Sequence, residues 1–142
     1  MTTKIRVLFV CTANAARSQM AEGLLRAKYG DRYEVFSAGT RLAKVSTRAI
    51  AVMQEIGIDI SHHRSKTIDE FRGTSFDLAV TLCDNAHVAC PYIPGSKKTI
   101  HHGFSDPHLM PGTDETILDG YRRVRDEIAD WINGEFGTLS QK

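Results

Sequence analysis

The stretch VCTANAARSQ, residues 10–19, follows an apolar run and leads into a segment rich in helix-forming residues. It places Cys11 six positions before Arg17, with only small or polar residues between them. A strand that passes through a short loop into a helix points backbone N–H groups and the positive end of the helix dipole at one place. The stretch therefore predicts an anion-binding loop, although a tight turn that merely contains a cysteine would show the same spacing.

The residue types in this loop favour chemistry on a tetrahedral oxyanion. Arg17 carries a planar guanidinium that can bind two oxyanion oxygens at once. Cys11, at the base of a positive loop, is expected to be a thiolate at neutral pH and hence a nucleophile. Ser18 can donate a hydrogen bond to this sulfur, and Asn14 can brace the loop. We expect the oxyanion-binding loop to comprise Thr12, Ala13, Asn14, Ala15, Ala16, Arg17 and Ser18.

Length and charge restrict the class of protein. A chain of 142 residues suits one domain, spanning 1–142, with a single hydrophobic core. The hydrophobic share of 42% and the charged share of 25% are typical of a globular protein. With 18 basic and 17 acidic side chains, the net charge of +1 favours neither nucleic acid nor membrane as a partner.

The N-terminal apolar run and the cysteines predict a cytoplasmic protein. Residues 7–10 are too few for a secretory signal, whose apolar core has about 7–15 residues, and no run approaches the ~20 of a membrane span. The three cysteines, Cys11, Cys83 and Cys90, are an odd number, which is a poor basis for a disulfide framework. They indicate catalytic or metal-binding thiols, or else cysteines buried as small hydrophobes.

Strand and helix patterns alternate along the chain. Apolar runs predict strands at residues 5–10, 33–37, 76–82 and 99–102. Helices are predicted over 18–29, over 46–56 and, from apolar spacings of three and four, through 117–131. This order predicts an α/β fold of three layers, with a four-stranded parallel sheet flanked by helices. The polar segments 83–95 and 103–112 follow strands, so we expect them at the carboxyl edge of the sheet, where ligands bind.

The last predicted helix separates apolar and charged side chains. Trp131 lies on the apolar stripe and is expected in the core. The charged residues are interpreted as a solvated face. They are Arg122, Arg123, Arg125, Asp126 and Asp130.

Four motifs resemble one known family. The segment FVCTANAARSQMAEG, residues 9–23, resembles the Cys-x5-Arg-Ser signature of the low-molecular-weight protein tyrosine phosphatase fold. SAGT at 37–40, DISHHRS at 59–65 and GFSDP at 103–107 match the same family in order, so the resemblance covers essentially the whole chain. It implies that Asp106, which precedes Pro107, is the general acid that protonates a leaving oxygen.

The segment VTLCDNAHVACP, residues 80–91, resembles the thioredoxin-coupled arsenate reductases, a branch of this fold. The resemblance implies that Cys11 attacks arsenate, that Cys83 then attacks Cys11 and that Cys90 attacks Cys83. Reduced thioredoxin would supply the electrons, with no tightly bound cofactor, and phosphate and sulfate would compete with arsenate as oxyanions.

Two positions depart from that branch. Many of its members carry a further cysteine where this chain has Ala16, but this cysteine has no step in the thiol relay. Some members also bind a potassium ion, and Asn14, Glu22 and Ser37 match part of that site. Lys66 stands where a ligating aspartate is expected. We therefore expect no metal ion, with the Lys66 ammonium bracing Asn14 or Glu22 in place of potassium, and a bound potassium ion is the alternative that stays open at this point.

Other functions remain open at this point. A low-molecular-weight tyrosine or aryl phosphatase would use the same loop, although no tyrosine follows the Asp106–Pro107 pair to flank phosphotyrosine. A non-enzymatic arsenic- or thiol-sensing module would need Cys83 and Cys90 but no general acid. The histidines lack the spacing of a metal site and are interpreted as loop or strand-end residues. They are His62, His63, His87, His101, His102 and His108.

Overall fold

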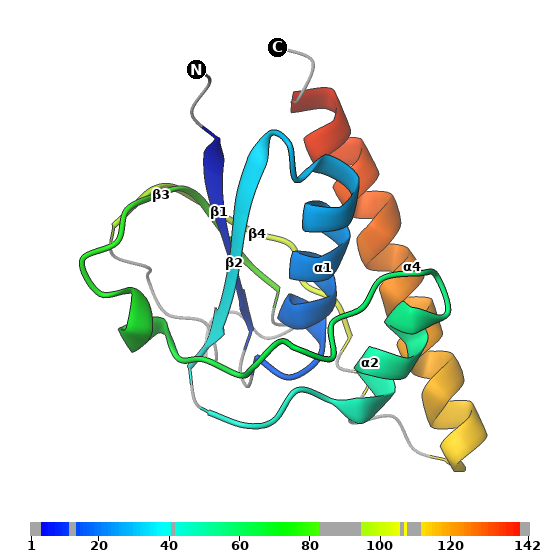
Figure 1. Cartoon of the computed structure of the whole chain (residues 1–142). Helices are drawn as coiled ribbons and strands as arrows, with labels where there is room; N and C mark the ends of the chain where they lie inside the picture. The colour runs from blue at the N-terminus through cyan, green and yellow to red at the C-terminus, as the bar shows by residue number, and fades with distance from the viewer. Residues whose placement is uncertain are drawn as a thin grey trace.

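The computed structural model describes residues 4–11, 14–40, 42–82, 95–105, 107 and 112–139. The strands are β1 (Ile5–Cys11), β2 (Tyr33–Gly39), β3 (Phe76–Thr81) and β4 (Ser96–His101). The helices are α1 (Arg17–Tyr29), α2 (Thr47–Gln54), the short 3-10 helix η1 (Ile68–Phe71) and α4 (Asp114–Leu139). The strands form one parallel sheet in the order β2-β1-β3-β4, which confirms the predicted α/β fold (Figure 1).

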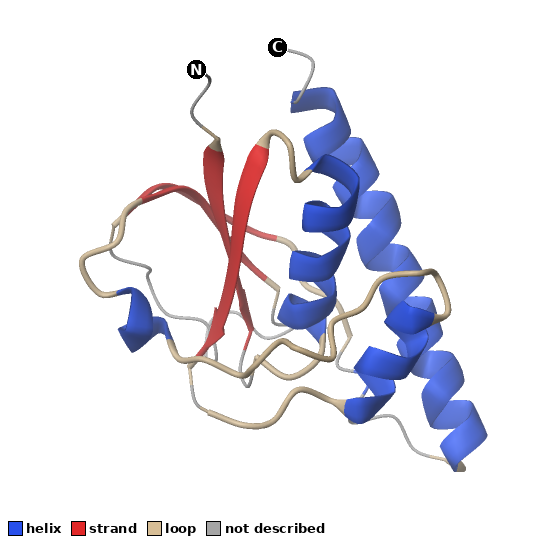
Figure 2. Ribbon diagram, viewed as in Figure 1, coloured by secondary structure: helices blue, strands red, loops and turns tan. Residues whose placement is uncertain are grey.

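Each face of the sheet carries its own apolar cluster. Helices α1, α2 and α4 lie together on one face, with α1 and α4 side by side (Figure 2). Along β1, Val7 and Phe9 pack toward these helices, whereas Leu8 and Val10 pack on the opposite face with Phe76 of β3. Side chains of η1 cover this second face. The continuous apolar run of β1 therefore reflects burial on two sides, as parallel sheets require.

The ends of the strands differ from the sequence prediction. β1 and β2 extend to Cys11 and Gly39, because these two residues pair with each other at the end of the ladder. β4 begins at Ser96, three residues earlier than predicted, since it is an edge strand whose early residues face solvent. Such a strand carries no apolar pattern, so only backbone pairing with β3 defines its start.

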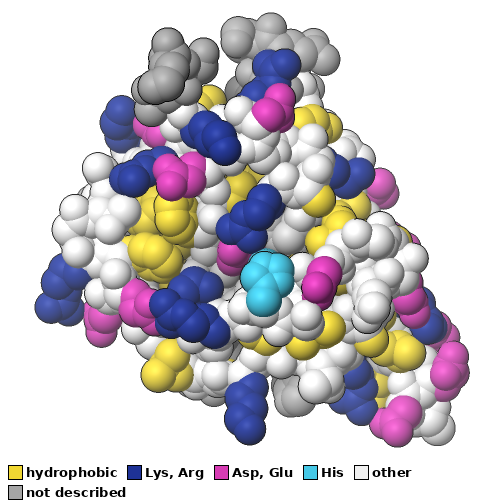
Figure 3. All heavy atoms as spheres, viewed as in Figure 1, with side chains coloured by type: hydrophobic (Ala, Val, Ile, Leu, Met, Phe, Trp, Pro, Cys, Tyr) yellow, Lys and Arg dark blue, Asp and Glu magenta, His cyan; other side chains and the backbone are white. Residues whose placement is uncertain are grey.

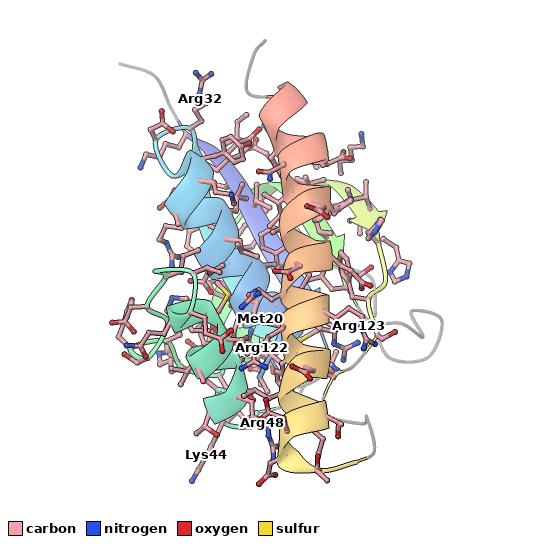
Figure 4. All side chains as sticks on the ribbon, turned by 90° about the vertical axis from the view of Figure 1, so that its right-hand side faces the viewer. Met20, Arg32, Lys44, Arg48, Arg122 and Arg123 are labelled. Atoms are coloured by element: carbon pink, nitrogen blue, oxygen red, sulfur yellow. The ribbon has the colours of Figure 1, made fainter. Side chains whose placement is uncertain are left out.

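The interpretation of a solvated face on α4 was wrong for Arg125. This side chain is buried, and its Nη1 donates to the Val52 carbonyl oxygen at 2.8 Å and to Glu55 Oε1 at 2.9 Å. Arg122 also donates to Glu55, whereas Arg123 is exposed on the other side of the helix (Figure 4). The reason is tertiary: the C-terminal end of α2 packs against α4 and presents a carbonyl and a carboxylate there.

Trp131 lies in the aromatic part of the core, as predicted. Its ring meets those of Phe9 and Phe136 edge-on, with centroids 6.4 and 5.6 Å apart. Met20, on α1, is also fully buried (Figure 4). Within the described part of the chain, no helix is long and apolar enough to cross a membrane.

Candidate active site

The predicted oxyanion loop connects the end of β1 to the start of α1. Cys11 is the last residue of β1 and is only 2% exposed. Helix α1 begins at Arg17, with no side-chain cap at Ala16 and no acidic residue in its first turn. The positive end of the helix is therefore directed at the loop without a carboxylate to neutralise it. Thr12 and Ala13 lie outside the described residues.

Ser18 lies next to the sulfur of Cys11. The Ser18 hydroxyl oxygen is 2.9 Å from Cys11 Sγ, and it accepts a hydrogen bond from Asn14 Nδ2 at 2.7 Å. Because Ser18 already accepts from Asn14, its own hydrogen is available for the sulfur. The Ser18 hydroxyl is therefore placed to donate a hydrogen bond to Cys11 Sγ.

Asn14 shapes the loop through its backbone conformation. It is fully buried and has a φ angle of 52°, in the left-handed region that asparagine tolerates better than most residues. Its Oδ1 accepts hydrogen bonds from the Lys66 backbone N–H at 2.8 Å and from Gln19 Nε2 at 2.9 Å. The backbone of Lys66 therefore stabilises the conformation of the loop through the side chain of Asn14.

A second contact holds the loop from helix α2. The Ala15 carbonyl oxygen accepts a hydrogen bond at 2.9 Å from the backbone N–H of Ser46. Ser46 is also the N-cap of α2, where its hydroxyl accepts from the Ala49 N–H, and it donates to the hydroxyl of buried Tyr121 on α4. The loop is thus connected to both α2 and α4.

Arg17 is buried at the mouth of the loop. It is 5% exposed, and its Nη1 donates to the carbonyl oxygen of Phe104 at 3.2 Å. Phe104 precedes the predicted acid Asp106 by two residues. Asp106 itself lies outside the described residues, but Arg17 is bound to the segment that leads to it.

Cys83 and Cys90 also lie outside the described residues, but the chain enters their segment beside the loop. Leu82, directly before Cys83, donates its N–H to the Val10 carbonyl oxygen at 2.8 Å. The Leu82 carbonyl oxygen in turn accepts from the Phe104 N–H at 3.1 Å. The segments that lead to Cys11, Cys83 and Asp106 therefore converge at the carboxyl edge of the sheet, as expected for an open α/β fold.

Glu22 and Ser37 form a buried polar pair behind the loop. The Glu22 carboxylate accepts from the Ser37 hydroxyl and from the Arg26 guanidinium, one helical turn further along α1. Sequence reasoning missed Arg26, although its i, i+4 spacing from Glu22 is the pattern of a helical ion pair.

The backbone and the ammonium group of Lys66 have different partners. It donates to the Arg64 carbonyl oxygen at 3.0 Å, so the backbone of Lys66, and not its ammonium, contacts Asn14. Burial lowers the pKa of Lys66, and the negative charge of Glu22 opposes this shift. Lys66 therefore lies within electrostatic range of Glu22.

Gln19 is a further residue that sequence reasoning missed. It is fully buried on α1, and its Nε2 contacts Asn14 and also donates to the Arg64 carbonyl oxygen at 2.9 Å. Its Oε1 is 2.9 Å from His63 Nδ1. No pattern in the sequence distinguishes this glutamine from a surface residue, because two of its partners, Arg64 and His63, lie more than 40 positions away.

The other described histidines have different surroundings. His101 Nδ1 is 2.8 Å from the Thr81 hydroxyl, and the His102 ring stacks on Trp131. His87 and His108 lie outside the described residues. Within the parts of the chain that the structure describes, no cluster of three or more His, Cys, Asp or Glu side chains could hold a metal ion.

The surface charge is mixed in sign. On the face shown in Figure 3, Lys and Arg side chains alternate with Asp and Glu side chains, and no extended region of one sign is visible. This agrees with a net charge of +1. The positive features of the site are thus local, namely the start of α1 and Arg17.

Comparison with known proteins identifies a family and similar enzymes. Residues 6–142 match the low molecular weight phosphotyrosine protein phosphatase family. The chain is 48% identical over 122 residues to the arsenate reductase of Halalkalibacterium halodurans, covering 86% of this chain and 88% of that one.

Solved structures with the same fold include both kinds of enzyme. A structure of an arsenate reductase in the phosphate-binding state is 28% identical, covers 94% of this chain and 98% of that chain, and matches with a TM-score of 0.79. The low molecular weight protein tyrosine phosphatase of T. tengcongensis is 29% identical and matches with a TM-score of 0.73. The match covers 95% of this chain and 99% of that chain. This chain belongs to the low molecular weight phosphotyrosine protein phosphatase family.

Proposed function

We propose that this protein is an arsenate reductase in which Cys11 is the nucleophile and Cys83 and Cys90 form a thiol relay that thioredoxin reduces. The observation that carries the proposal is the hydrogen bond from Leu82 to Val10, which brings the residue before Cys83 beside the residue before Cys11. The similarity to arsenate reductases along most of the chain supports the same assignment.

The first step would form a bond between sulfur and arsenic. The Cys11 thiolate attacks arsenate held by the loop N–H groups and Arg17. One arsenate oxygen leaves as water, with one proton from Asp106 and one already on that oxygen. The buried position of Arg17 and its bond to Phe104 support its role as the clamp for the oxyanion.

The next steps would be two thiol exchanges. The Cys83 thiolate attacks Cys11 Sγ, the electron pair of the S–As bond passes to arsenic, and arsenite leaves with a Cys11–Cys83 disulfide behind it. Cys90 then attacks Cys83 and frees Cys11, so the two electrons come from Cys83 and Cys90. A dithiol reductant, for which we propose thioredoxin, reduces the Cys83–Cys90 disulfide. This requirement for a reducing partner favours the cytoplasm.

The proposal is tested by arsenate turnover with thioredoxin, thioredoxin reductase and NADPH. We expect Cys83→Ser and Cys90→Ser each to abolish multiple turnover. Cys90→Ser should still release one arsenite per chain and accumulate a Cys11–Cys83 disulfide, detectable by mass spectrometry after acid quenching. Cys83→Ser should release none. Continued turnover in both variants would contradict the relay.

Aryl phosphate hydrolysis is the matched control reaction. It needs the loop and an acid but no second thiol, so both serine variants should hydrolyse an aryl phosphate, whereas Cys11→Ser should not. A phosphatase is the second candidate function, favoured by the match to the tyrosine phosphatase of T. tengcongensis. Efficient hydrolysis of phosphotyrosine peptides without arsenate reduction would establish it instead.

We also propose that the enzyme works without potassium. The oxygens that would hold the ion already have partners: Glu22 accepts from Ser37 and Arg26, and Asn14 Oδ1 accepts from Gln19 and Lys66. Two cationic side chains, those of Arg26 and Lys66, also lie near Glu22. Equal activity and equal melting temperature in potassium chloride and choline chloride are expected, and a rise specific to potassium would contradict this.

A further inference from the structure

Two neighbouring histidines at the end of β4 have different partners. His101 is the last residue of the strand, and its Nδ1 contacts the Thr81 hydroxyl. The ring of His102, the next residue, stacks on Trp131 of α4, with centroids 5.0 Å apart and an angle of 23° between the planes. The chain therefore reaches the side of α4 directly after β4 (Figure 1). Neither histidine has a part in the steps proposed above.

Trp131 contacts the same segment a second time, through Phe104. These two rings meet edge to face, with centroids 6.1 Å apart and an interplanar angle of 71°. The rings of Phe104 and His102 also contact each other, with centroids 4.8 Å apart. Trp131 in turn meets Phe9 of β1 and Phe136 of α4 edge-on. One indole thus packs the segment after β4 against the aromatic part of the core.

The backbone of Phe104 is the point at which this segment meets the site. Its carbonyl oxygen accepts from Arg17 Nη1 at 3.2 Å, and its N–H donates to the Leu82 carbonyl oxygen at 3.1 Å. The Arg17 guanidinium is planar and rigid, so a fixed acceptor for one of its N–H groups restricts the orientation of the whole group. A shift of the Phe104 backbone would therefore turn the guanidinium relative to the oxyanion.

Exposure distinguishes the His102 stack from ordinary core packing. Phe104 is buried, whereas His102 is exposed and Trp131 is only partly buried. Burial of apolar area does not require a polar ring on the exposed part of an indole. A flat stack does restrict the position of the segment, because aromatic pairs prefer a defined relative geometry.

We infer that Trp131 and His102 are positioning residues that hold the Phe104 carbonyl oxygen where it orients Arg17 for the oxyanion. The contacts lead from α4, through the stacked and edge-on rings, to the backbone group that Arg17 binds. Neither Trp131 nor His102 touches the substrate in this assignment. The inference rests on the proposed role of Arg17 as the clamp for the oxyanion.

The first test measures the stack itself. Protons of a ring that lies over an indole move upfield in the 1H NMR spectrum, because of the ring current of the indole. We therefore expect the ring protons of His102 to move downfield in Trp131→Leu, while those of His101 stay in place. Unchanged chemical shifts for His102 would overturn the inference.

The second test measures phosphate binding as protection of Cys11 from iodoacetamide, in a parent chain with Cys83→Ser and Cys90→Ser so that only Cys11 reacts. The phosphate concentration that gives half protection yields the dissociation constant. We expect Trp131→Leu to raise this constant about 3- to 10-fold and His102→Ala about 2- to 5-fold, since both remove aromatic contacts. His102→Phe keeps a ring for the stack and should stay within about twofold of the parent chain.

Two matched controls separate positioning from stability. His101→Ala removes an adjacent exposed histidine that contacts Thr81 instead of Trp131, so phosphate binding should not change. Phe136→Leu removes another ring that packs on Trp131, so it should lower the melting temperature without weakening phosphate binding.

Two results would overturn the inference alone. If Trp131 only supported the fold, Trp131→Leu and Phe136→Leu would both lower the melting temperature and leave phosphate binding unchanged. Equal weakening by His102→Phe and His102→Ala would show that the imidazole, and not the stack, is responsible. Because His102 is exposed, this second comparison decides the question even where Trp131→Leu does not fold.

A different result would contradict the proposed site as well. Phosphate that failed to protect Cys11 in the parent chain would contradict the oxyanion loop itself, and with it the positioning roles. The assay contains neither arsenate nor thioredoxin, so its result is independent of whether the chain reduces arsenate.

Discussion

Ser46 donates its backbone N–H to the carbonyl oxygen of Ala15 at 2.9 Å, which joins the start of α2 to the oxyanion loop. The two residues are 31 positions apart in the sequence, and neither is charged. The same serine caps α2 through its hydroxyl. The backbone N–H of Ser46 therefore binds the loop, whereas its side chain caps α2, and substitutions can separate these two interactions.

Replacing Ser46 by alanine or by proline separates these interactions. Ser46→Ala removes the cap but keeps the N–H, so we expect a loss of about 1 kcal/mol in the free energy of unfolding and arsenate turnover within a few-fold of wild type. Ser46→Pro suits the φ of −63° but also removes the N–H, so turnover should fall about tenfold further. Equal turnover in the two variants would mean that the bond to Ala15 has no part in shaping the loop.

Removing the Ser18 hydroxyl should slow the chemical step. Because this hydroxyl lies 2.9 Å from Cys11 Sγ and a hydrogen bond to a charged group is worth about 1.5–3 kcal/mol, Ser18→Ala should lower kcat for arsenate by about 10- to 100-fold. KM should change much less, since Arg17 and the loop N–H groups remain. Steady-state kinetics measure both constants, and a change confined to KM would contradict the assignment.

The buried arginine of α4 should contribute to stability. Arg125→Met leaves the Val52 carbonyl oxygen without its donor, so the free energy of unfolding should fall by about 1–3 kcal/mol. The control is Arg123→Met on the exposed side of the same helix, which should stay within about 0.5 kcal/mol of wild type. Urea denaturation of the two variants provides the comparison, and equal stabilities would contradict the role of Arg125.

Stability should fall in mild acid because of His63. Burial lowers the pKa of His63 below its ordinary value of 6.5, with Glu22 opposing the shift and Arg26, His62 and Lys66 adding to it. Between the lowered value and 6.5 the unfolded chain binds more protons, so stability rises with pH across this window and is lost as pH falls through it.

Thermal unfolding at two pH values tests this dependence. Between pH values of about 7.5 and 5.5, the melting temperature of the wild type should fall more than that of His63→Asn, which has no imidazole to protonate. Parallel decreases in the two proteins would show that other groups cause the pH dependence.

Two glycines should respond in opposite directions to alanine. Gly57 has a φ of +81°, and the backbone N–H groups of Gly57 and Ile58 bond to the last turn of α2, so Gly57→Ala should cost about 1–2 kcal/mol. Gly134 lies inside α4, and an added methyl group there would meet no atom within 4 Å. Gly134→Ala should therefore stabilise the protein by about 0.5–1 kcal/mol. The melting temperatures of the two variants test this prediction. A change of the same sign in both variants would contradict it.

Several features of the fold could be predicted from local sequence. The apolar run before Cys11, the small residues after it and the helix formers that follow define β1, the loop and α1, because each depends on neighbours a few positions away. The start of β4 could not be predicted, because an exposed edge strand is defined by pairing with β3 and not by an apolar pattern. Arg125 was misassigned for a related reason, since a helical pattern does not show which part of a charged face meets another helix.

The sequence by itself therefore determined the fold class, through the alternation of strand and helix patterns, and the family, through motifs of a few adjacent residues. It also predicts Cys11 as the nucleophile, because a strand, a loop and a helix follow one another directly there. Only the tertiary structure decided how the loop is held. Gln19, Arg26 and His63 become partners because the segment after α2 folds back beside α1, and Ser46 meets Ala15 for the same kind of reason. Hydrogen-bond direction depends on atoms brought together from distant positions, and no local pattern of residues encodes it.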